Sequence, residues 1–147
     1  MRDPDTISTA MTAAETGHLV FSTLHTNSAS QTIDRIIDSF PPNQQGQVVS
    51  QLASTLIATV SQRLIPRIGG GRVPATEIML VNPAIKNLIR ERKIYQIDLV
   101  IETSIQEGML SLNRSLVNLV KRKEISMEQA LAFSLNPSEL RILVNRT

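Results

Sequence analysis

The two histidines of this 147-residue chain stand at the two ends of one apolar segment. His18 precedes it and His25 follows it, and residues 19–24 between them are almost all apolar or small. A neutral imidazole can donate one hydrogen bond and accept another, so a histidine can report whether the terminal phosphate of a polyanion is present. The alternative is that both histidines make only structural hydrogen bonds at strand ends. The residues alone leave both interpretations open.

Composition excludes several kinds of chemistry. The chain has no cysteine, which excludes disulfides, cysteine-ligated zinc and thiol catalysis, and we expect no metal site in it. Tryptophan is absent and aromatic residues make up 3%, so stacking on nucleic acid is not expected. No apolar run approaches the roughly 20 residues of a membrane span. Residues 1–62 carry two basic and five acidic side chains, against thirteen and eight in residues 63–147, which suggests two subregions.

Helical spacing of apolar residues recurs through the first part of the chain. Asp3-Pro4 is typical of an N-cap followed by a first-turn proline, and Gly17 is typical of a left-handed C-cap. Apolar residues three and four apart then predict three helices. Their apolar faces are Ile7, Ala10, Met11 and Ala14; Ala29, Ile33, Ile36, Ile37 and Phe40, after a start at Ser28 or Ser30; and Val49, Leu52, Ala53, Leu56 and Val60, after Pro41-Pro42.

Strands are expected in three places. Residues 18–25 are apolar on both faces, which predicts a strand inside a parallel sheet that helices cover. Residues 63–68 and 73–81 flank Gly69-Gly70-Gly71, which predicts a β-hairpin. One two-sided strand and one hairpin cannot cover each other's faces and edges. We therefore expect strands that pair with residues 18–25 to lie outside this chain, and the chain alone to be poorly soluble.

The pattern changes after Asn82-Pro83, another N-cap with a first-turn proline. Short helices are expected from there to the end, and two pairs predict capping boxes, Ser126 with Gln129 and Asn136 with Glu139. The expected apolar faces are Ile85, Leu88 and Ile89, and Leu112, Leu116, Leu119 and Val120. The predicted fold class is thus α/β, with an incomplete α/β part over residues 1–81 and a small all-helical region over residues 82–147.

Several segments of the chain match a known pattern together. They are Met1-Arg2-Asp3, residues 12–21 (Thr-Ala-Ala-Glu-Thr-Gly-His-Leu-Val-Phe), residues 23–26 (Thr-Leu-His-Thr), residues 33–38 followed by Phe40-Pro41-Pro42, residues 60–64, and Ala84-Ile85-Lys86-Asn87-Leu88-Ile89-Arg90-Glu91. This set resembles the secretion ATPase superfamily, and within it the retraction ATPases of type IV pili. The last segment discriminates best, because it resembles their Ala-Ile-Arg-Asn-Leu-Ile-Arg-Glu helix, with Lys86 in place of arginine. The lack of a four-cysteine zinc motif points away from the assembly ATPases of pili and type II secretion.

The resemblance implies a fold and a motor function. Residues 1–81 would be the C-terminal half of a RecA-like P-loop ATPase core, and residues 82–147 the helical C-terminal region. The parent protein would be a homo-hexamer that uses ATP and Mg²⁺ to drive pilus retraction and twitching motility. It would lie in the cytoplasm, peripheral to the inner membrane at the base of the pilus, with the inner-membrane platform protein as its partner. No nucleic-acid partner and no membrane span are expected.

The family's phosphate loop, Gly-x-x-x-x-Gly-Lys-Ser/Thr, is missing from the 147 residues. The resemblance places that loop and the Walker B glutamate before Met1, so the chain is expected to be a fragment that begins within Walker B. Phosphoryl transfer depends on backbone donors, a lysine and magnesium that clamp the phosphates. The isolated chain is therefore expected to be inactive as an ATPase.

The resemblance also implies roles for individual residues, and each role has an alternative. His25 and His18 match the histidine box that senses the nucleotide. Arg2 and Asp3 match the end of Walker B, although Asp3 could serve only as an N-cap. The residues expected to contact the nucleotide or a neighbouring subunit are Thr26, Gln62 and Arg63.

The alternatives for these contact residues are structural. Thr26 and Asn27 could only cap the next helix. Arg63 could pair with an acidic group on its neighbour. Residues 84–91 would form an exposed motif needed for retraction, or else a helix with a solvated polar face. For the whole protein, the alternatives are a paralogous pilus assembly or type II secretion ATPase, or a non-catalytic module that docks into motor hexamers.

Overall fold

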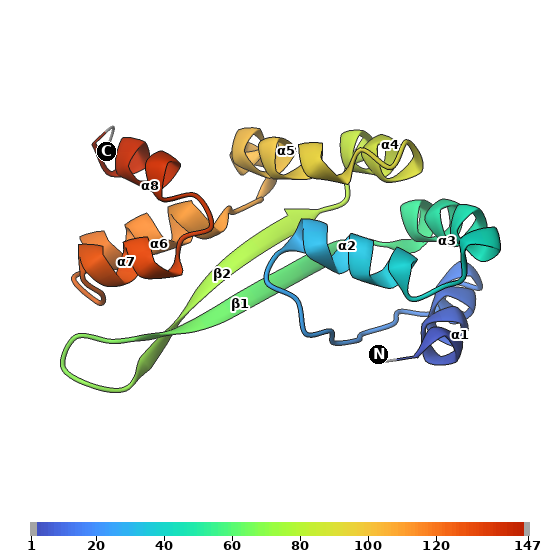
Figure 1. The fold of residues 1–147 in the computed structure, drawn as a ribbon, viewed down its shortest axis with the longest axis horizontal. Helices are drawn as coiled ribbons and strands as arrows, with labels where there is room; N and C mark the ends of the chain where they lie inside the picture. Colours follow the sequence, from blue (N-terminus) through green and yellow to red (C-terminus); the bar gives the residue numbers. More distant parts are fainter. Residues whose placement is uncertain (1–2, 146–147) are drawn as a thin grey trace.

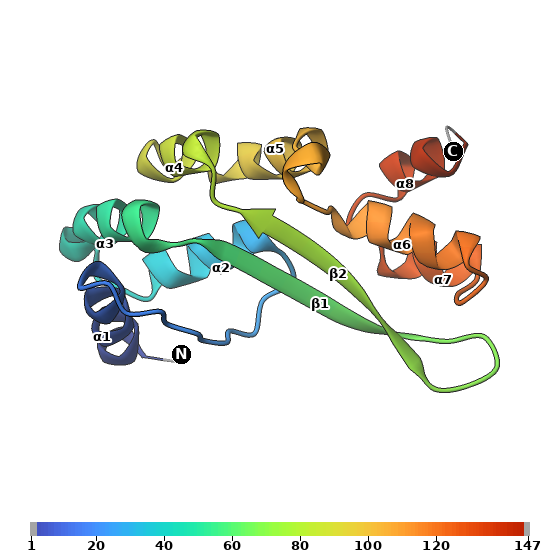
Figure 2. The ribbon, with the colours of Figure 1, turned by 180° about the vertical axis from the view of Figure 1, so that it is seen from behind.

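A long antiparallel hairpin is the spine of the molecule in the computed structural model, which describes residues 3–145 (Figure 1). The hairpin joins β1 (Ala58–Pro66) to β2 (Arg72–Leu80), and its register runs from Ala58 opposite Leu80 to Pro66 opposite Arg72. Helices gather around its two ends, and Figure 2 shows the same arrangement from behind. The predicted mixture of helices and strands is confirmed.

The helices form two groups along this spine. The first group packs near the start of β1 and the end of β2, and comprises α1 (Pro4–Glu15), α2 (Ala29–Asp38), α3 (Pro42–Thr55), α4 (Pro83–Arg90) and α5 (Ile97–Thr103), with a 3₁₀ helix at Ile94–Gln96. The second group packs nearer the hairpin tip and comprises α6 (Leu112–Lys121), α7 (Met127–Phe133) and α8 (Pro137–Asn145). A 3₁₀ helix at Ile105–Glu107 precedes the second group. None of the helices between residues 3 and 145 combines the length and apolarity needed to cross a bilayer.

Local capping chemistry sets most helix boundaries as predicted. The Asp3 carboxylate accepts a hydrogen bond from the Thr6 backbone N–H at 2.9 Å, and Asn82 accepts one from Ile85 at 3.0 Å. Gly17 ends the first helical segment with a φ of 92°. The capping box of Ser126 and Gln129 is confirmed, with both of its hydrogen bonds present.

Only one of the two hydrogen bonds of the second predicted capping box, that of Asn136 with Glu139, forms. Asn136 accepts a hydrogen bond from the Glu139 backbone N–H at 3.3 Å, as expected. The Glu139 carboxylate, however, accepts from the Asn113 side chain at 2.6 Å, and the Asn136 backbone N–H donates to Ser134 at 3.0 Å. Asn113 is buried on α6, so a contact between helices replaces the local one.

The hairpin is longer than predicted, and this corrects two expectations. β1 begins at Ala58 and not at residue 63, and α3 ends at Thr55. Val60, predicted on the apolar stripe of the third helix, therefore lies in β1 and is 64% exposed. Its spacing from Leu56 fits a helix, but β-branched residues at 57, 59 and 60 favour a strand. Pairing with β2 decides between the two.

The strand predicted over residues 18–25 is wrong for this chain. The segment is irregular, and Leu19 and Phe21 are 71% and 88% exposed. A two-sided apolar strand forms only where neighbouring strands take up its backbone hydrogen bonds and helices cover its faces. Among residues 3–145, the sheet contains β1 and β2 and no strand that pairs with residues 18–25.

Two hydrophobic clusters hold the molecule together. The first joins the buried faces of α1 to α5, with Met79 and Met109. The second joins Ile65 and Ala75 of the hairpin to α6, α7 and α8. The predicted faces of α2, α4 and α6 are buried in these clusters or packed against them. The division of the chain at residue 81 stays a prediction.

Candidate functional site

A hollow of about 1220 Å³ lies between α1, residues 17–26, the end of α3 and the start of β1. Figure 2 shows residues 17–28 crossing this region as an irregular loop between α1 and α2. Three predicted site residues, His18, Thr26 and Gln62, line the hollow. The fold thus brings side chains from a helix end, a loop and a strand to one concave surface.

His18 folds back onto the end of α1. Its Nδ1 lies 3.1 Å from the Thr16 hydroxyl and 3.2 Å from the Ala13 carbonyl oxygen. A carbonyl can only accept, so Nδ1 is the donor in that contact, and in the neutral ring Nε2 is left as an acceptor. The exposed ring is therefore oriented by the helix and keeps one nitrogen available for a ligand.

His25 is placed differently from His18. Its side chain is exposed and does not line the hollow. Within the described range, residues 3–145, no hydrogen bond or ion pair holds the His25 ring. The structure therefore does not bring the two histidines to one site in this chain.

Thr26 anchors the loop to α2. Its hydroxyl lies 2.7 Å from the Thr32 hydroxyl, which itself donates to the Ser28 carbonyl at 2.9 Å, so Thr26 is the donor to Thr32. The N-cap of α2 is Ser28, whose hydroxyl accepts from the Gln31 backbone N–H at 3.2 Å. Ser28, and not Thr26, therefore caps α2.

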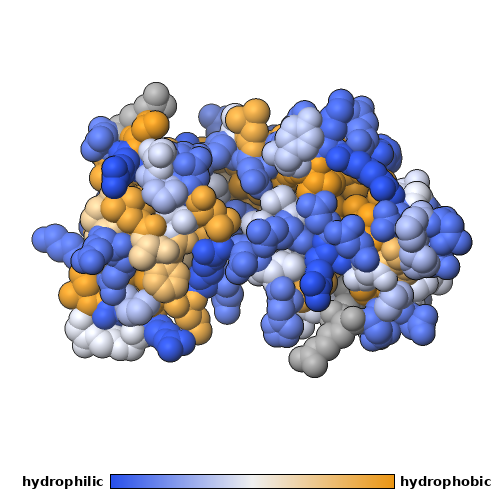
Figure 3. All heavy atoms as spheres, viewed as in Figure 1, coloured by the Kyte–Doolittle hydropathy of each residue, from blue (hydrophilic) through white to orange (hydrophobic). Residues whose placement is uncertain are grey.

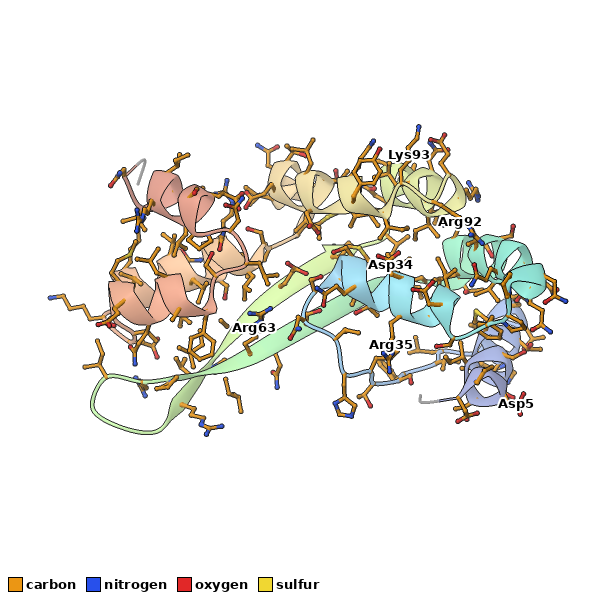
Figure 4. All side chains as sticks on the ribbon, in the orientation of Figure 1. Asp5, Asp34, Arg35, Arg63, Arg92 and Lys93 are labelled. Carbon is orange, nitrogen blue, oxygen red and sulfur yellow. The ribbon has the colours of Figure 1, made fainter. Side chains whose placement is uncertain are left out.

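The alternation of β1 separates Gln62 from Arg63. Gln62 is exposed toward the hollow, whereas Arg63 points to the opposite face, which the helices cover (Figure 4). Arg63 donates to the Phe133 carbonyl at 3.0 Å and to the Asn27 carbonyl at 3.3 Å. Its Nε is buried and has no partner among the described residues. In this structure Arg63 therefore ties the loop before α2 to the end of α7 through two backbone carbonyls.

Of the two residues predicted at the end of Walker B, only Asp3 lies within the described residues. Asp3 accepts two hydrogen bonds from Thr6, and the backbone hydrogen bond is the main reason that the pKa of Asp3 is lowered. The predicted role of Arg2 lies outside the described residues.

Residues 84–91 form α4 and its C-cap, with one buried and one polar face. Ile85 and Ile89 are fully buried, and Leu88 packs against the same cluster. On the polar face, Glu91 accepts from Asn87 at 2.9 Å and pairs with Lys93 at 2.7 Å, and the bond from Lys93 is the larger cause of its lowered pKa. Figure 4 shows Lys93 beside Arg92 at the α4 end of the molecule.

Sequence reasoning missed Glu77, which is 7% exposed on β2. Its carboxylate accepts a hydrogen bond from the Ala29 backbone N–H at 2.7 Å, so it sits at the N-terminus of α2. Burial raises the pKa of Glu77, and hydrogen bonds from the Ala29 and Leu112 backbones lower it in part. The one available indication was a lone charged residue in an otherwise apolar strand.

The hollow supplies only part of what a nucleotide needs. Among residues 3–145, no lysine or arginine lines it, so these residues do not complete a phosphate clamp. Among the residues that the structure describes, no group of three or more histidine, aspartate or glutamate side chains could hold a metal ion. What the site offers is an oriented imidazole, hydroxyls and a glutamine amide on one concave surface.

Comparisons with known proteins find relatives among secretion system and pilus proteins. Residues 1–70 match the family described as type II/IV secretion system protein. The chain is 53% identical over 130 residues to the type IV pilus retraction ATPase PilT of Pseudomonas aeruginosa, covering 88% of this chain and 38% of that protein. It is 50% identical over 131 residues to a twitching motility protein of Neisseria gonorrhoeae, covering 88% and 35%.

A solved structure supports the same relation. The crystal structure of the pilus retraction motor PilT with bound ADP superimposes with a TM-score of 0.86 at 48% identity, over 97% of this chain and 40% of that chain. The chain therefore spans between about a third and two fifths of the length of these relatives.

Proposed function

We propose, from the match of residues 1–70 to the family described as type II/IV secretion system protein, that this chain is the nucleotide-responsive C-terminal part of a pilus retraction ATPase. The observation that carries the proposal is the sequence identity of 50% and 53% to a twitching motility protein and a retraction ATPase, over 88% of the chain. The superposition on a retraction motor with bound ADP supports nucleotide use. Residues 1–81 would form the nucleotide side, and residues 82–147 the helical region that delivers the movement.

The finer parts of this proposal concern cofactors, assembly and location. The parent protein would hydrolyse ATP with Mg²⁺ as a homo-hexamer, in the cytoplasm and peripheral to the inner membrane, and would act on the inner-membrane platform of a pilus. His25 and His18 would sense the nucleotide, and Thr26, Gln62 and Arg63 would contact the nucleotide or a neighbouring subunit. The polar face of α4, with Lys86 and Arg90, would contact the partner.

We also propose that the 147-residue chain alone hydrolyses no ATP. Its 147 residues contain no Gly-x-x-x-x-Gly-Lys-Ser/Thr loop, and the described residues that line the hollow include no lysine or arginine to bind phosphate. Phosphate release from ATP and Mg²⁺ should equal that of a protein-free blank. Turnover that stays with the chain through repeated purification would contradict this part of the proposal.

A chimera tests the retraction function. The matching residues of P. aeruginosa PilT are replaced by this chain, and ATP hydrolysis and twitching are measured in a strain without its own PilT. We expect both activities to be present. A chimera that hydrolyses ATP but supports pilus assembly or secretion, and not twitching, would overturn the retraction function.

Two variants of the chimera separate the proposed roles. His25→Ala should lower hydrolysis about tenfold or more, since a lost hydrogen bond to a charged group costs about 1.5–3 kcal/mol. Lys86→Ala with Arg90→Ala should keep hydrolysis, because neither side chain lines the hollow, and should lose twitching, because the proposed partner contact is removed. Equal loss of hydrolysis in the two variants would contradict this division.

A further inference from the structure

Three consecutive residues of β2 hold both helical groups to the hairpin. The Thr76 backbone N–H donates to the Ser115 hydroxyl on α6 at 3.0 Å. Ile78 exchanges two backbone hydrogen bonds with Leu110, just before α6, at 2.7 and 2.9 Å. Between them, Glu77 accepts from Ala29 at the start of α2 at 2.7 Å. The N-terminal turns of α2 and α6 therefore meet at one short piece of strand.

Glu77 is the charged centre of this junction. A glutamate that is 7% exposed loses most of its hydration, and its placement has to be explained by what it binds. Its Oε1 accepts from the backbone N–H of Ala29, the first residue of α2, and the neighbouring Thr76 and Ile78 bond α6 and Leu110 just before it. Both helix N-termini carry partial positive charge, which favours an anion between them. Glutamine in the same place is neutral, so its amide oxygen would accept a weaker hydrogen bond from Ala29.

Arg63 connects the same two regions on the neighbouring strand. Ala75, next to Glu77 on the inner face of β2, pairs with Arg63 on β1. The Arg63 guanidinium donates to Asn27 at the end of the loop and to Phe133 at the end of α7. The loop that carries His25 and Thr26 is thus held on its α2 side by one buried anion and one partly buried cation.

We propose that Glu77 is a positioning residue, whose carboxylate holds the first turn of α2, and with it the end of the loop of residues 17–28, to the strand segment that also holds the start of α6. A shift of the loop is then passed to α6 and α7 through the hairpin. That this shift reports a bound nucleotide rests on the proposed function. The hydrogen bonds of the junction do not, because they are present in the chain without nucleotide.

Hydrogen exchange of the nucleotide-free 147-residue chain tests the junction. In Glu77→Gln, peptides covering residues 27–33 should exchange about tenfold faster than in the wild type, as expected for loss of a charge-assisted hydrogen bond. Peptides covering residues 44–54 of α3 should not change. Glu128→Gln, an exposed glutamate in the first turn of α7, is the matched control and should match the wild type. Wild-type exchange at residues 27–33, or equal loosening of α3, would overturn the proposal.

A spectroscopic measurement on the wild type covers the case in which E77Q does not fold. The Ala29 amide proton should follow the ionisation of Glu77 in an NMR titration, with a midpoint above the ordinary glutamate pKa of about 4.3. The other charged groups that act on Glu77 are Asp98 from α5 and Arg63 from β1. An Ala29 amide that does not titrate would overturn the proposal. A failure of the nucleotide function would leave both results unchanged and would appear only in the chimera.

Discussion

At the scale of single residues, Glu77 gives the chain a pH dependence with a definite sign. Burial raises its pKa, so the folded chain keeps the proton to a higher pH than the unfolded chain, in which glutamate titrates near about 4.3. Its contribution to the free energy of unfolding is therefore greatest below the unfolded pKa and is lost as the pH rises through the folded pKa. The carboxylate is retained in spite of this loss, which suits a role in position rather than stability.

Urea unfolding from about pH 4 to about pH 7 measures this term. The free energy of unfolding of Glu77→Gln minus that of the wild type should rise with pH over this range. The wild type loses stability as buried Glu77 ionises, whereas glutamine does not ionise. Asp34 and Glu139 also have raised pKa values, but both remain in the two proteins and cancel in the difference. A difference that stays constant with pH would contradict the prediction.

Arg63 should contribute to the free energy of unfolding through the planar geometry of its guanidinium, and not through its charge alone. One guanidinium serves two carbonyls on separate elements, and the ammonium of lysine cannot reproduce that geometry. We expect Arg63→Lys to lower the free energy of unfolding by about 1–3 kcal/mol, measured in urea. Arg67→Lys is the control: its side chain is 53% exposed and pairs with Glu124 at 3.4 Å, so it should cost less than about 1 kcal/mol. Equal effects would mean that charge alone matters at both positions.

At the scale of elements, two glycines should respond to alanine with opposite signs. Gly46 lies inside α3 with nothing near its missing Cβ, so alanine should raise the free energy of unfolding by about 0.5–1 kcal/mol. Gly17 has as much space but a φ of 92°, so alanine there should lower it by about 1–2 kcal/mol. Thermal unfolding of both variants checks the pair. A change of the same sign in both would show that backbone conformation does not decide the outcome.

The elements that the sequence predicts well are those set by neighbours along the chain. Asp3, Asn82 and Ser126 mark helix starts because each cap bonds a residue three positions on. The failures are non-local. Residues 18–25 have the composition of a strand but no pairing partner among the described residues, and Glu139 leaves its local box for Asn113 on another helix.

The residues of the candidate site also divide into those that the sequence identified and those that depend on non-local contacts. His18, Thr26 and Gln62 were identified through the family resemblance, and the fold brings them to one hollow. The separation of Gln62 from Arg63 follows from β1 beginning five residues earlier than predicted, since the alternation of a strand puts neighbours on opposite faces. Glu77 was missed because its role depends on α2, which starts 48 residues earlier in the chain.

At the scale of the whole molecule, the apolar surface is unevenly distributed. Figure 3 shows apolar side chains reaching the surface in several places. Around the hollow they form a group, in which Leu19, Phe21, Ile57 and Val60 are each more than 60% exposed. A group of exposed apolar side chains of this kind drives association, because each large side chain that becomes buried contributes about 1.5–3 kcal/mol.

Two leucines of equal exposure test whether grouping decides the association. Leu19, at 71% exposure, belongs to the group around the hollow, whereas Leu99, at 68%, stands on α5 outside it. Leu19→Ser should weaken self-association of the chain by about tenfold or more in dissociation constant, and Leu99→Ser should leave it near the wild type. Light scattering over a range of concentrations measures both. If the two variants associate alike, or if the wild type is already monomeric at high concentration, then the hollow is not the surface through which copies of the chain meet.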